Sequence, residues 1–223
     1  MNGETKKKSV GSVLYDDVMG GLRPMIPFVA GGGILMAISF MFGMRIGDNS
    51  VNQFAKILYE IGHNNAMLLM IPIFAGFIAH TIAGQDALAP GMIGGMIAKT
   101  TGSGFLGGIV AGFLAGYLVK LLNKLLGNFP EDFQSIKKLL IIPVISTFVV
   151  GIVMLCVVSV PMAWLNQGLT GFIDGLGTQN LVLTGMVIGG MMAVDLGGPI
   201  NKVAYTFAVA AISNGNYYPM AAA

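Results

Sequence analysis

The run Leu139–Trp164, LLIIPVISTFVVGIVMLCVVSVPMAW, decides the fold class of this chain. It contains no charged residue and exceeds the roughly 20 apolar residues that a helix needs to cross the hydrocarbon core of a bilayer. A surface helix of a soluble protein would carry a polar face, which this run lacks. The run therefore predicts an integral membrane protein and argues against a soluble enzyme.

The composition of the whole chain agrees with a membrane protein. Its 223 residues are 55% hydrophobic and 10% charged, whereas about a quarter of the residues in a soluble domain are charged. The net charge of +2 is too small to indicate a nucleic-acid partner. Many of the 33 glycines lie inside apolar stretches, which is typical of helices that pack closely in lipid.

Further apolar runs predict the other membrane segments, at about 24–44, 66–83, 86–99, 103–119 and 181–195, with a last one beginning near residue 204. Pro24 and Pro27 fall near the start of the first helix, where proline is tolerated. The polar residues Arg45, Glu60, Asn64 and Asn65 are interpreted as part of a solvated loop. We expect an all-α, polytopic integral membrane helix bundle with about six or seven spanning segments and broken or re-entrant helices. The short segment 86–99 either spans the membrane or is re-entrant.

Charge distribution predicts the domains and the orientation. Residues 1–22 are expected to be a cytoplasmic N-terminal segment that is not cleaved, and residues 23–223 the transmembrane domain. Basic loops face the cytoplasm, so the richest one is placed there too; it contains Lys120, Lys124, Lys137 and Lys138. An even number of crossings must then separate it from the N-terminus, which requires segment 86–99 to cross.

Gly108, Gly112 and Gly116 recur at every fourth position within one predicted helix. Residues four apart share a helix face, and a face of glycines lets another helix approach closely. The face serves either packing within the chain or contact with a second copy.

The stretch 191–205 places polar groups between two apolar runs. Charge near the hydrocarbon is costly, so Asp195, Asn201 and Lys202 are candidates for a function. The three residues Gly197, Gly198 and Pro199 should break the helix, and broken helices often line transporter sites. A carboxylate, an amide and an ammonium together supply the acceptors and donors that a sugar needs. The alternative is a surface loop in which Lys202 reaches lipid headgroups.

A second polar stretch, 80–91, contains His80 and Asp86 between two apolar runs. His80 could bond a sugar hydroxyl or an interior carbonyl. The alternative is an ordinary turn between helices, with Asp86 capping the next one. The two histidines of the chain have no cysteine or HExxH partner, so no metal site is predicted. No nucleophile, base and acid can be assembled from residue spacing.

At these residues the chain resembles the fructose-type permeases, or enzyme IIC (EIIC) subunits, of the bacterial phosphotransferase system. The resemblance rests on MAVDLGGPINKVAY at 192–205. It is supported by MIPFVAGGG at 25–33, by FAGFIAH at 74–80 with LAPG at 88–91, and by GNYYPMA at 215–221.

The resemblance implies the activity, the partners and the location. Such a permease of the bacterial inner membrane binds fructose or a similar sugar from outside and presents it to a phosphorylated cytoplasmic IIB partner. The complex is a transferase, but its phosphoryl groups travel on a cysteine of the B domain and on histidines of other proteins. No catalytic residue and no cofactor are therefore expected here. The resemblance also implies a homodimer, with the basic loop contacting either an acidic phosphoprotein or lipid headgroups.

Two departures from the family pattern leave other functions open. The chain has Gln85-Asp86 where the family often has Asp-Arg, and it ends at Ala223 where family members continue. A shortened permease is expected. The alternatives are an ion-coupled secondary transporter that uses Asp195 as its proton or sodium group, and a non-transporting truncated remnant or assembly partner.

Overall fold

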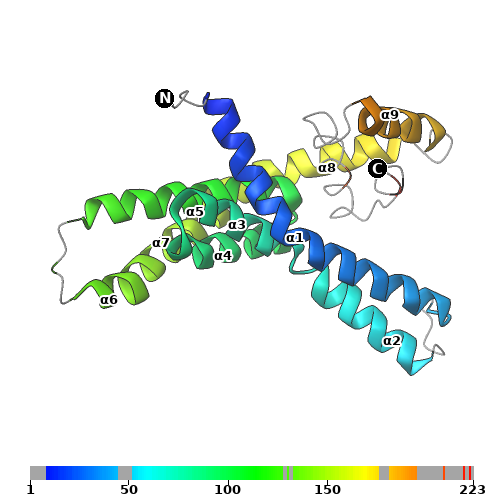
Figure 1. The fold of residues 1–223 in the computed structure, drawn as a ribbon, viewed down its shortest axis with the longest axis horizontal. Coiled ribbons are helices and arrows are strands. Elements are labelled where there is room, and N and C mark those ends of the chain that lie inside the picture. Colours follow the sequence, from blue (N-terminus) through cyan, green and yellow to red (C-terminus); the bar gives the residue numbers. More distant parts are fainter. Residues whose placement is uncertain are drawn as a thin grey trace, which may run out of the picture.

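The computed structural model describes residues 9–44, 52–127, 130, 133–175 and 181–194, and the single residues 208, 218 and 221. Every element in these ranges is helical. The α-helices are α1 (Val10–Met41), α2 (Gln53–Tyr59), α3 (Met70–Ala83), α4 (Leu88–Thr100), α5 (Gly104–Leu125), α6 (Gln134–Ile136), α7 (Ile142–Val153), α8 (Ser159–Gly175) and α9 (Leu181–Val194). Figure 1 shows their arrangement.

Four helical stretches in the described residues are long and apolar enough to cross a membrane. They are Val10–Met41, Gln53–Ala83, Gly104–Leu125 and Gln134–Gly168. A shorter apolar helix covers Val182–Ala193. The prediction of a polytopic helical membrane bundle is thereby confirmed. The lysines predicted to lie in a basic loop lie instead in the flanking helices, Lys120 and Lys124 in the last turns of α5 and Lys137 and Lys138 in the Gln134–Gly168 stretch.

The first helix begins earlier than predicted. α1 starts at Val10, and Pro24 and Pro27 lie inside it, not near its start. Each interior proline removes one backbone hydrogen bond and bends a helix, and Figure 1 shows α1 bending between its two halves. The prediction took Arg23 as the boundary because the apolar run begins after it. The helix, however, also includes the charged residues Asp16 and Asp17 that precede this run.

The polar stretch before α3 is helical and not a loop, which corrects the interpretation of Glu60, Asn64 and Asn65. They lie in a π-helical turn, Glu60–Ala66 (η1), between α2 and α3. The Asn65 amide donates to the Glu60 carbonyl at 2.8 Å, five residues back, and the Asn64 amide donates to the Glu60 carboxylate. The side chains of Asn64 and Asn65 thus form their hydrogen bonds within the helical stretch itself. Arg45 lies outside the described residues.

Glycines bring the helices of the core together, and the stripe on α5 packs within the chain. Cβ atoms built on Gly108, Gly112 and Gly116 would lie 2.7–2.8 Å from side-chain carbons of α3. α4 packs against both α3 and α5, so these three consecutive helices form the centre of the bundle. The largest buried side chains at their contacts include Phe74 and Phe105, whose rings stack 4.3 Å apart.

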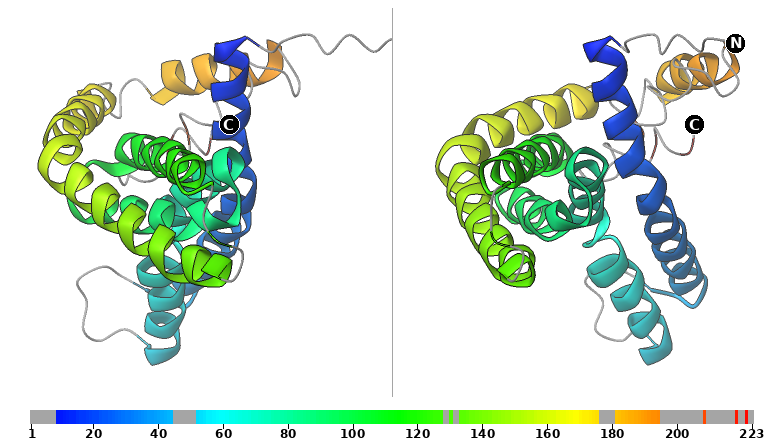
Figure 2. Two further views of the ribbon diagram at one scale, coloured as in Figure 1. Left: turned by 90° about the vertical axis from the view of Figure 1, so that its left-hand side faces the viewer. Right: turned by 60° about the vertical axis from the view of Figure 1, so that its left-hand side comes forward.

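The last long stretch runs along the outside of this core, as Figure 2 shows. α6, α7 and α8 are joined by two π-helical turns, Lys137–Ile141 (η4) and Met154–Val158 (η5). α7 contacts α4 and α5, and α8 contacts α5. α7 also exposes large apolar side chains such as Val144 and Phe148, as expected for a lipid-facing surface.

Candidate functional site

The polar stretch 80–91 forms the junction between α3 and α4. α3 ends at Ala83 and is followed by Gly84, whose N–H donates to the His80 carbonyl at 2.8 Å. Gly84 has φ +76° and ψ −160°, a backbone conformation open essentially to glycine alone. The chain then makes a short 3₁₀ turn, Gln85–Ala87 (η2), before α4 begins. The junction is thus a tight turn that fixes where His80 and Asp86 stand.

Asp86 does not cap α4, contrary to the simpler interpretation of this stretch. The residue before α4 is Ala87, and no side chain caps that helix. The Asp86 carboxylate instead accepts a hydrogen bond from the Asn123 amide of α5 at 3.4 Å. Only one of its acceptor positions is used by this bond, so the carboxylate keeps capacity for a further donor.

His80 lies one helical turn before Gly84 and is half-buried. Its ring is tilted against Phe77, with the ring centroids 5.8 Å apart. The next residue, Thr81, bonds back to the Phe77 carbonyl at 2.7 Å and fills the space over Gly20 of α1. The N-terminal half of α1 therefore packs over the end of α3 that carries His80.

The second predicted group of site residues falls outside the described residues. It comprises Asp195, Gly197, Gly198, Pro199, Asn201 and Lys202. The described helix α9 leads up to this group and ends at Val194. Of the eight predicted substrate-binding residues, the structure thus positions His80 and Asp86, on consecutive elements of one junction.

A polar contact at the other end of α5 was missed from the sequence. The Asn166 amide of α8 donates to the Gly102 carbonyl at 3.2 Å. Ser103 donates to the Ser159 carbonyl at 3.4 Å and shares a hydrogen bond with Thr101 at 2.8 Å. These bonds fix α8 to the turn between α4 and α5. The two bonds to α8 join residues 56 and 64 positions apart in the chain, so no local pattern predicts them.

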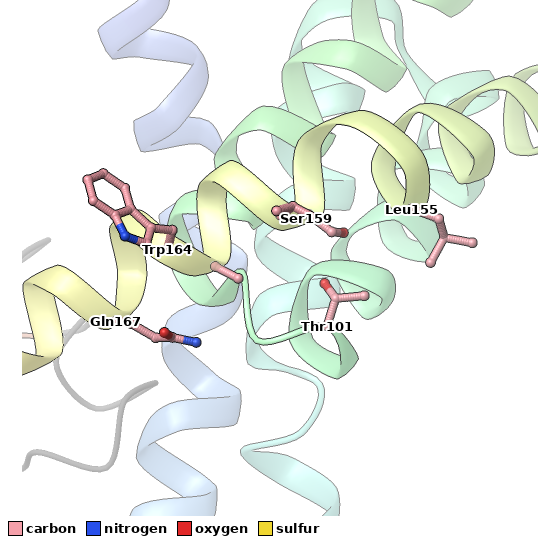
Figure 3. Close-up of a pocket in the computed structure, with 7 residues that line it drawn as sticks. Thr101, Leu155, Ser159, Trp164 and Gln167 are labelled. Atoms are coloured by element: carbon pink, nitrogen blue, oxygen red, sulfur yellow. The ribbon is translucent and has the colours of Figure 1, made fainter.

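A cavity of about 570 Å³ opens beside this contact, between α8 and the α4–α5 turn. The residues that line it include Thr101 of the turn and Ser159, Trp164 and Gln167 of α8, which Figure 3 labels. The Ser159 hydroxyl is buried and has no hydrogen-bond partner among the residues that the structure describes. Within the described part of the chain, no three histidine, cysteine or acidic residues stand close enough to hold a metal ion.

Four long apolar helical stretches with a glycine-packed centre define a multi-pass membrane protein. The sequence model of the family described as "Phosphotransferase system, EIIC" matches residues 19–222. The chain therefore belongs to the EIIC family of the phosphotransferase system. No solved structure matches it significantly.

Relatives of the chain are named as components of fructose-specific systems. It is 48% identical to the fructose-specific EIIABC component of Bacillus subtilis, over 98% of this chain and 35% of that protein. Identity is also 48% to the fructose permease IIC component of Bacillus amyloliquefaciens, over 78% of this chain and 58% of the relative. The fructose-specific EIIB'BC component of Escherichia coli is 46% identical over 98% of this chain and 38% of its own length. The chain thus spans about a third to three fifths of these relatives.

Proposed function

We propose that this chain is the sugar-translocating subunit of a fructose-type phosphotransferase system in the inner membrane of a bacterium. One observation carries the proposal: the EIIC family match covers residues 19–222, and the relatives with 46–48% identity are named fructose-specific. The four long apolar helical stretches of the described residues are consistent with such a membrane subunit.

The proposed substrate site combines the two polar stretches. For sugar hydroxyls, Asp195 supplies a hydrogen-bond acceptor, Lys202 a donor, and the Asn201 amide both a donor and an acceptor. The intervening Gly197, Gly198 and Pro199 open the backbone so that its polar groups also face the sugar. His80 and Asp86 add donors and acceptors from the α3–α4 junction, where the Asp86 carboxylate has acceptor capacity to spare.

We propose further that α4 crosses the membrane and is not re-entrant. The start of α4 is tied to Asn123 through Asp86, and its end meets α5 where Ala98 faces Gly107. Along α5, the rise from Gly107 to Asn123 is about 24 Å at 1.5 Å per residue, most of the roughly 30 Å of hydrocarbon. α4 itself has 13 residues and rises about 20 Å at 1.5 Å per residue, so it follows α5 over most of this length. A membrane-crossing α5 therefore supports a membrane-crossing α4.

The orientation follows from this count. With α1, α2–α3, α4 and α5 as four crossings, the N-terminus and the lysines that follow Val119 lie on the same side. Lysine-rich ends face the cytoplasm, so the 1–22 segment and the basic loop are cytoplasmic. The stretch Gln134–Gly168 is a fifth crossing, and the apolar runs from 181 and from about 204 bring the total to six or seven.

The chemical step belongs to a partner. The names of the Bacillus subtilis and Escherichia coli relatives place B and C components in one protein, and we propose a phosphorylated IIB partner that receives the sugar at the cytoplasmic end. This chain would bind and orient the sugar within a transferase complex and would itself carry no phosphoryl group. We further propose a homodimer surrounded by membrane lipids.

The test is uptake of radiolabelled fructose by cells that lack their own fructose permease. The chain is expressed with the phosphocarrier proteins present or deleted, and its presence in the membrane is checked by immunoblot. The proposal expects fructose phosphate to accumulate only when the carriers are present. Uptake that survives their deletion and collapses with an uncoupler would establish the ion-coupled alternative instead. If the inserted protein neither takes up nor binds fructose, it is an assembly partner that needs a second chain.

A further inference from the structure

The end of α5 and the start of η4 form a surface in which lysines alternate with exposed leucines. Lys120 and Lys124 lie one turn apart on α5, and Leu121 and Leu125 form the adjacent row. Leu125 is 70% exposed, and Leu139 of η4 is 80% exposed. We call the surface formed by Lys120, Leu121, Lys124, Leu125, Lys138 and Leu139 the lysine–leucine surface.

A buried lysine holds the two parts of this surface together. Lys137, at the start of η4, is 6% exposed, and its ammonium donates to the Leu126 carbonyl at the end of α5 at 2.6 Å. The end of a helix carries a partial negative charge, so this bond satisfies both groups. It brings the next residue, Lys138, beside the last turn of α5.

The other three lysines are exposed and make no hydrogen bond or ion pair with the part of the chain that the structure describes. Asp17 of α1 lies within electrostatic reach of Lys120 but is itself 7% exposed. The sequence also has Glu131 and Asp132 between α5 and α6, outside the described residues. Lys120, Lys124 and Lys138 thus present their charges outward from a helix end.

We propose that the lysine–leucine surface binds the phosphate of an anionic phospholipid, with acyl chains on its leucines. Two observations favour a lipid over an acidic protein. The cations stand at the end of a membrane helix, where headgroups lie. They are also interleaved with apolar side chains more than half exposed, among them Leu121, Leu125 and Leu139. A protein partner could contact these leucines only if they were first withdrawn from the lipid. The proposal depends on the membrane fold and not on the sugar that is carried.

A site-specific fluorescence assay tests the proposal. Trp164 is the only tryptophan in the chain, so Trp164→Phe with Leu125→Trp places a single reporter on the surface. The full chain is reconstituted in vesicles that contain dibrominated phosphatidylglycerol or dibrominated phosphatidylcholine, whose bromines quench nearby tryptophan. The ratio of quenching gives the local preference between the two lipids.

We expect the reporter at 125 to prefer the anionic lipid by roughly fivefold or more, the effect of one lysine near a membrane surface. Replacing Lys120, Lys124 and Lys138 together with glutamine should bring the ratio close to one, whereas replacing them with arginine should keep it. Trp164 in the otherwise unaltered chain reports on the other end of α5, and Lys99→Gln changes a lysine there. The Lys99→Gln variant should leave the ratio at 125 unchanged.

Equal quenching by the two lipids at position 125 would overturn the proposal and leave an acidic protein as the occupant. A preference that survives the triple glutamine variant would overturn it as well, because the lysines would then not be the cause. Normal quenching at Trp164 in the triple glutamine variant, measured without the reporter substitutions, shows that this variant is still inserted and folded.

Discussion

Asn123, near the end of α5, donates its side-chain amide to the Asp86 carboxylate in the turn before α4, across 3.4 Å. The bond joins residues 37 positions apart and places the α3–α4 junction level with the basic end of α5. Its consequence is topological: the junction and the basic loop must lie on one side of the membrane, whichever side that is.

Cysteine labelling tests this arrangement. In a Cys156→Ser background, Gln85→Cys should react with a membrane-impermeant maleimide in inverted membrane vesicles and not in intact spheroplasts. Thr100→Cys, at the other end of α4, should show the reverse, because α4 crosses the bilayer. The mass shift of the labelled protein measures both.

Lys124→Cys serves as the reference for the basic side and should follow Gln85→Cys in every preparation. Labelling of Gln85→Cys and Thr100→Cys from the same side would show that α4 is re-entrant, and the count of four crossings before the basic loop would be wrong.

The glycine stripe of α5 makes a second prediction. A Cβ on Gly112 would lie 2.8 Å from the Ala75 carbonyl oxygen and 2.7 Å from Ile78 Cβ, and backbone cannot move aside cheaply. Gly112→Ala should therefore lower stability by about 1–3 kcal/mol, the usual effect of overpacking. The midpoint of thermal unfolding in detergent micelles measures it.

Gly31→Ala is the matched control, since Gly31 is also in a helix but a Cβ there would meet nothing within 4 Å. Alanine is the better helix former by up to about 1 kcal/mol, so this variant should be as stable as the wild type or more so. Equal destabilisation by both substitutions would mean that close packing against α3 is not the reason for the glycine.

Much of this fold follows from the sequence because lipid imposes simple rules. Apolar runs predict spanning helices, and fourfold glycine spacing predicted the face of α5 that meets α3. Hydropathy failed where a helix is not apolar. It placed the start of the first helix at about residue 24 and not at Val10, and it treated Glu60, Asn64 and Asn65 as part of a loop. The Asn52 side chain accepts from the Phe54 N–H at 2.9 Å, a helix-capping signal that was present in the sequence and was not used.

The sequence predicted which residues belong to the candidate site but not which residues they contact. His80 and Asp86 were singled out as polar residues between apolar runs, yet the partner of Asp86 was not predicted, because Asn123 is distant in the chain. The same holds for Asn166 and the Gly102 carbonyl. Contacts of this kind depend on how helices pack, and packing is decided by many weak side-chain contacts at once.

The contact of Asn166 with the α4–α5 turn makes a third prediction. Asn166→Ala removes the amide that donates to the Gly102 carbonyl and should destabilise the protein by about 0.5–1.5 kcal/mol, the net contribution of one hydrogen bond, because Gly102 is exposed. The neighbouring Gln167 is exposed, so Gln167→Ala should change stability by less than about 0.5 kcal/mol. Unfolding midpoints of the two variants, compared side by side, decide whether α8 is held by this residue.

Gly84 makes a fourth prediction, in which backbone conformation and not space is decisive. A Cβ at Gly84 would meet nothing within 4 Å, but the residue has φ +76°. Gly84→Ala should thus cost about 1–3 kcal/mol through backbone strain alone. An unfolding midpoint equal to that of the wild type would show that the α3–α4 turn adopts another conformation in the membrane.

Fructose binding makes the last prediction, and Asp86 allows a structural role to be separated from a role in the proposed site. In Asp86→Asn the new amide retains an oxygen that can accept from Asn123, so the unfolding midpoint should stay unchanged. The substitution replaces a charged acceptor for a sugar hydroxyl with a neutral one, a difference of about 1–1.5 kcal/mol, so fructose affinity should fall roughly five- to tenfold. Equilibrium dialysis of radiolabelled fructose against purified protein measures the affinity.

Asp195→Asn and Asn201→Ala belong to the same experiment and should abolish binding and uptake while the protein still inserts in the membrane. Unchanged affinity in Asp86→Asn, with loss in the other two, would restrict the sugar site to the 191–205 stretch and leave Asp86 as a residue that aligns α4 with α5. Normal uptake by both Asp195→Asn and Asn201→Ala would remove that stretch from the site, since neither a carboxylate nor an amide there would be needed to hold the sugar.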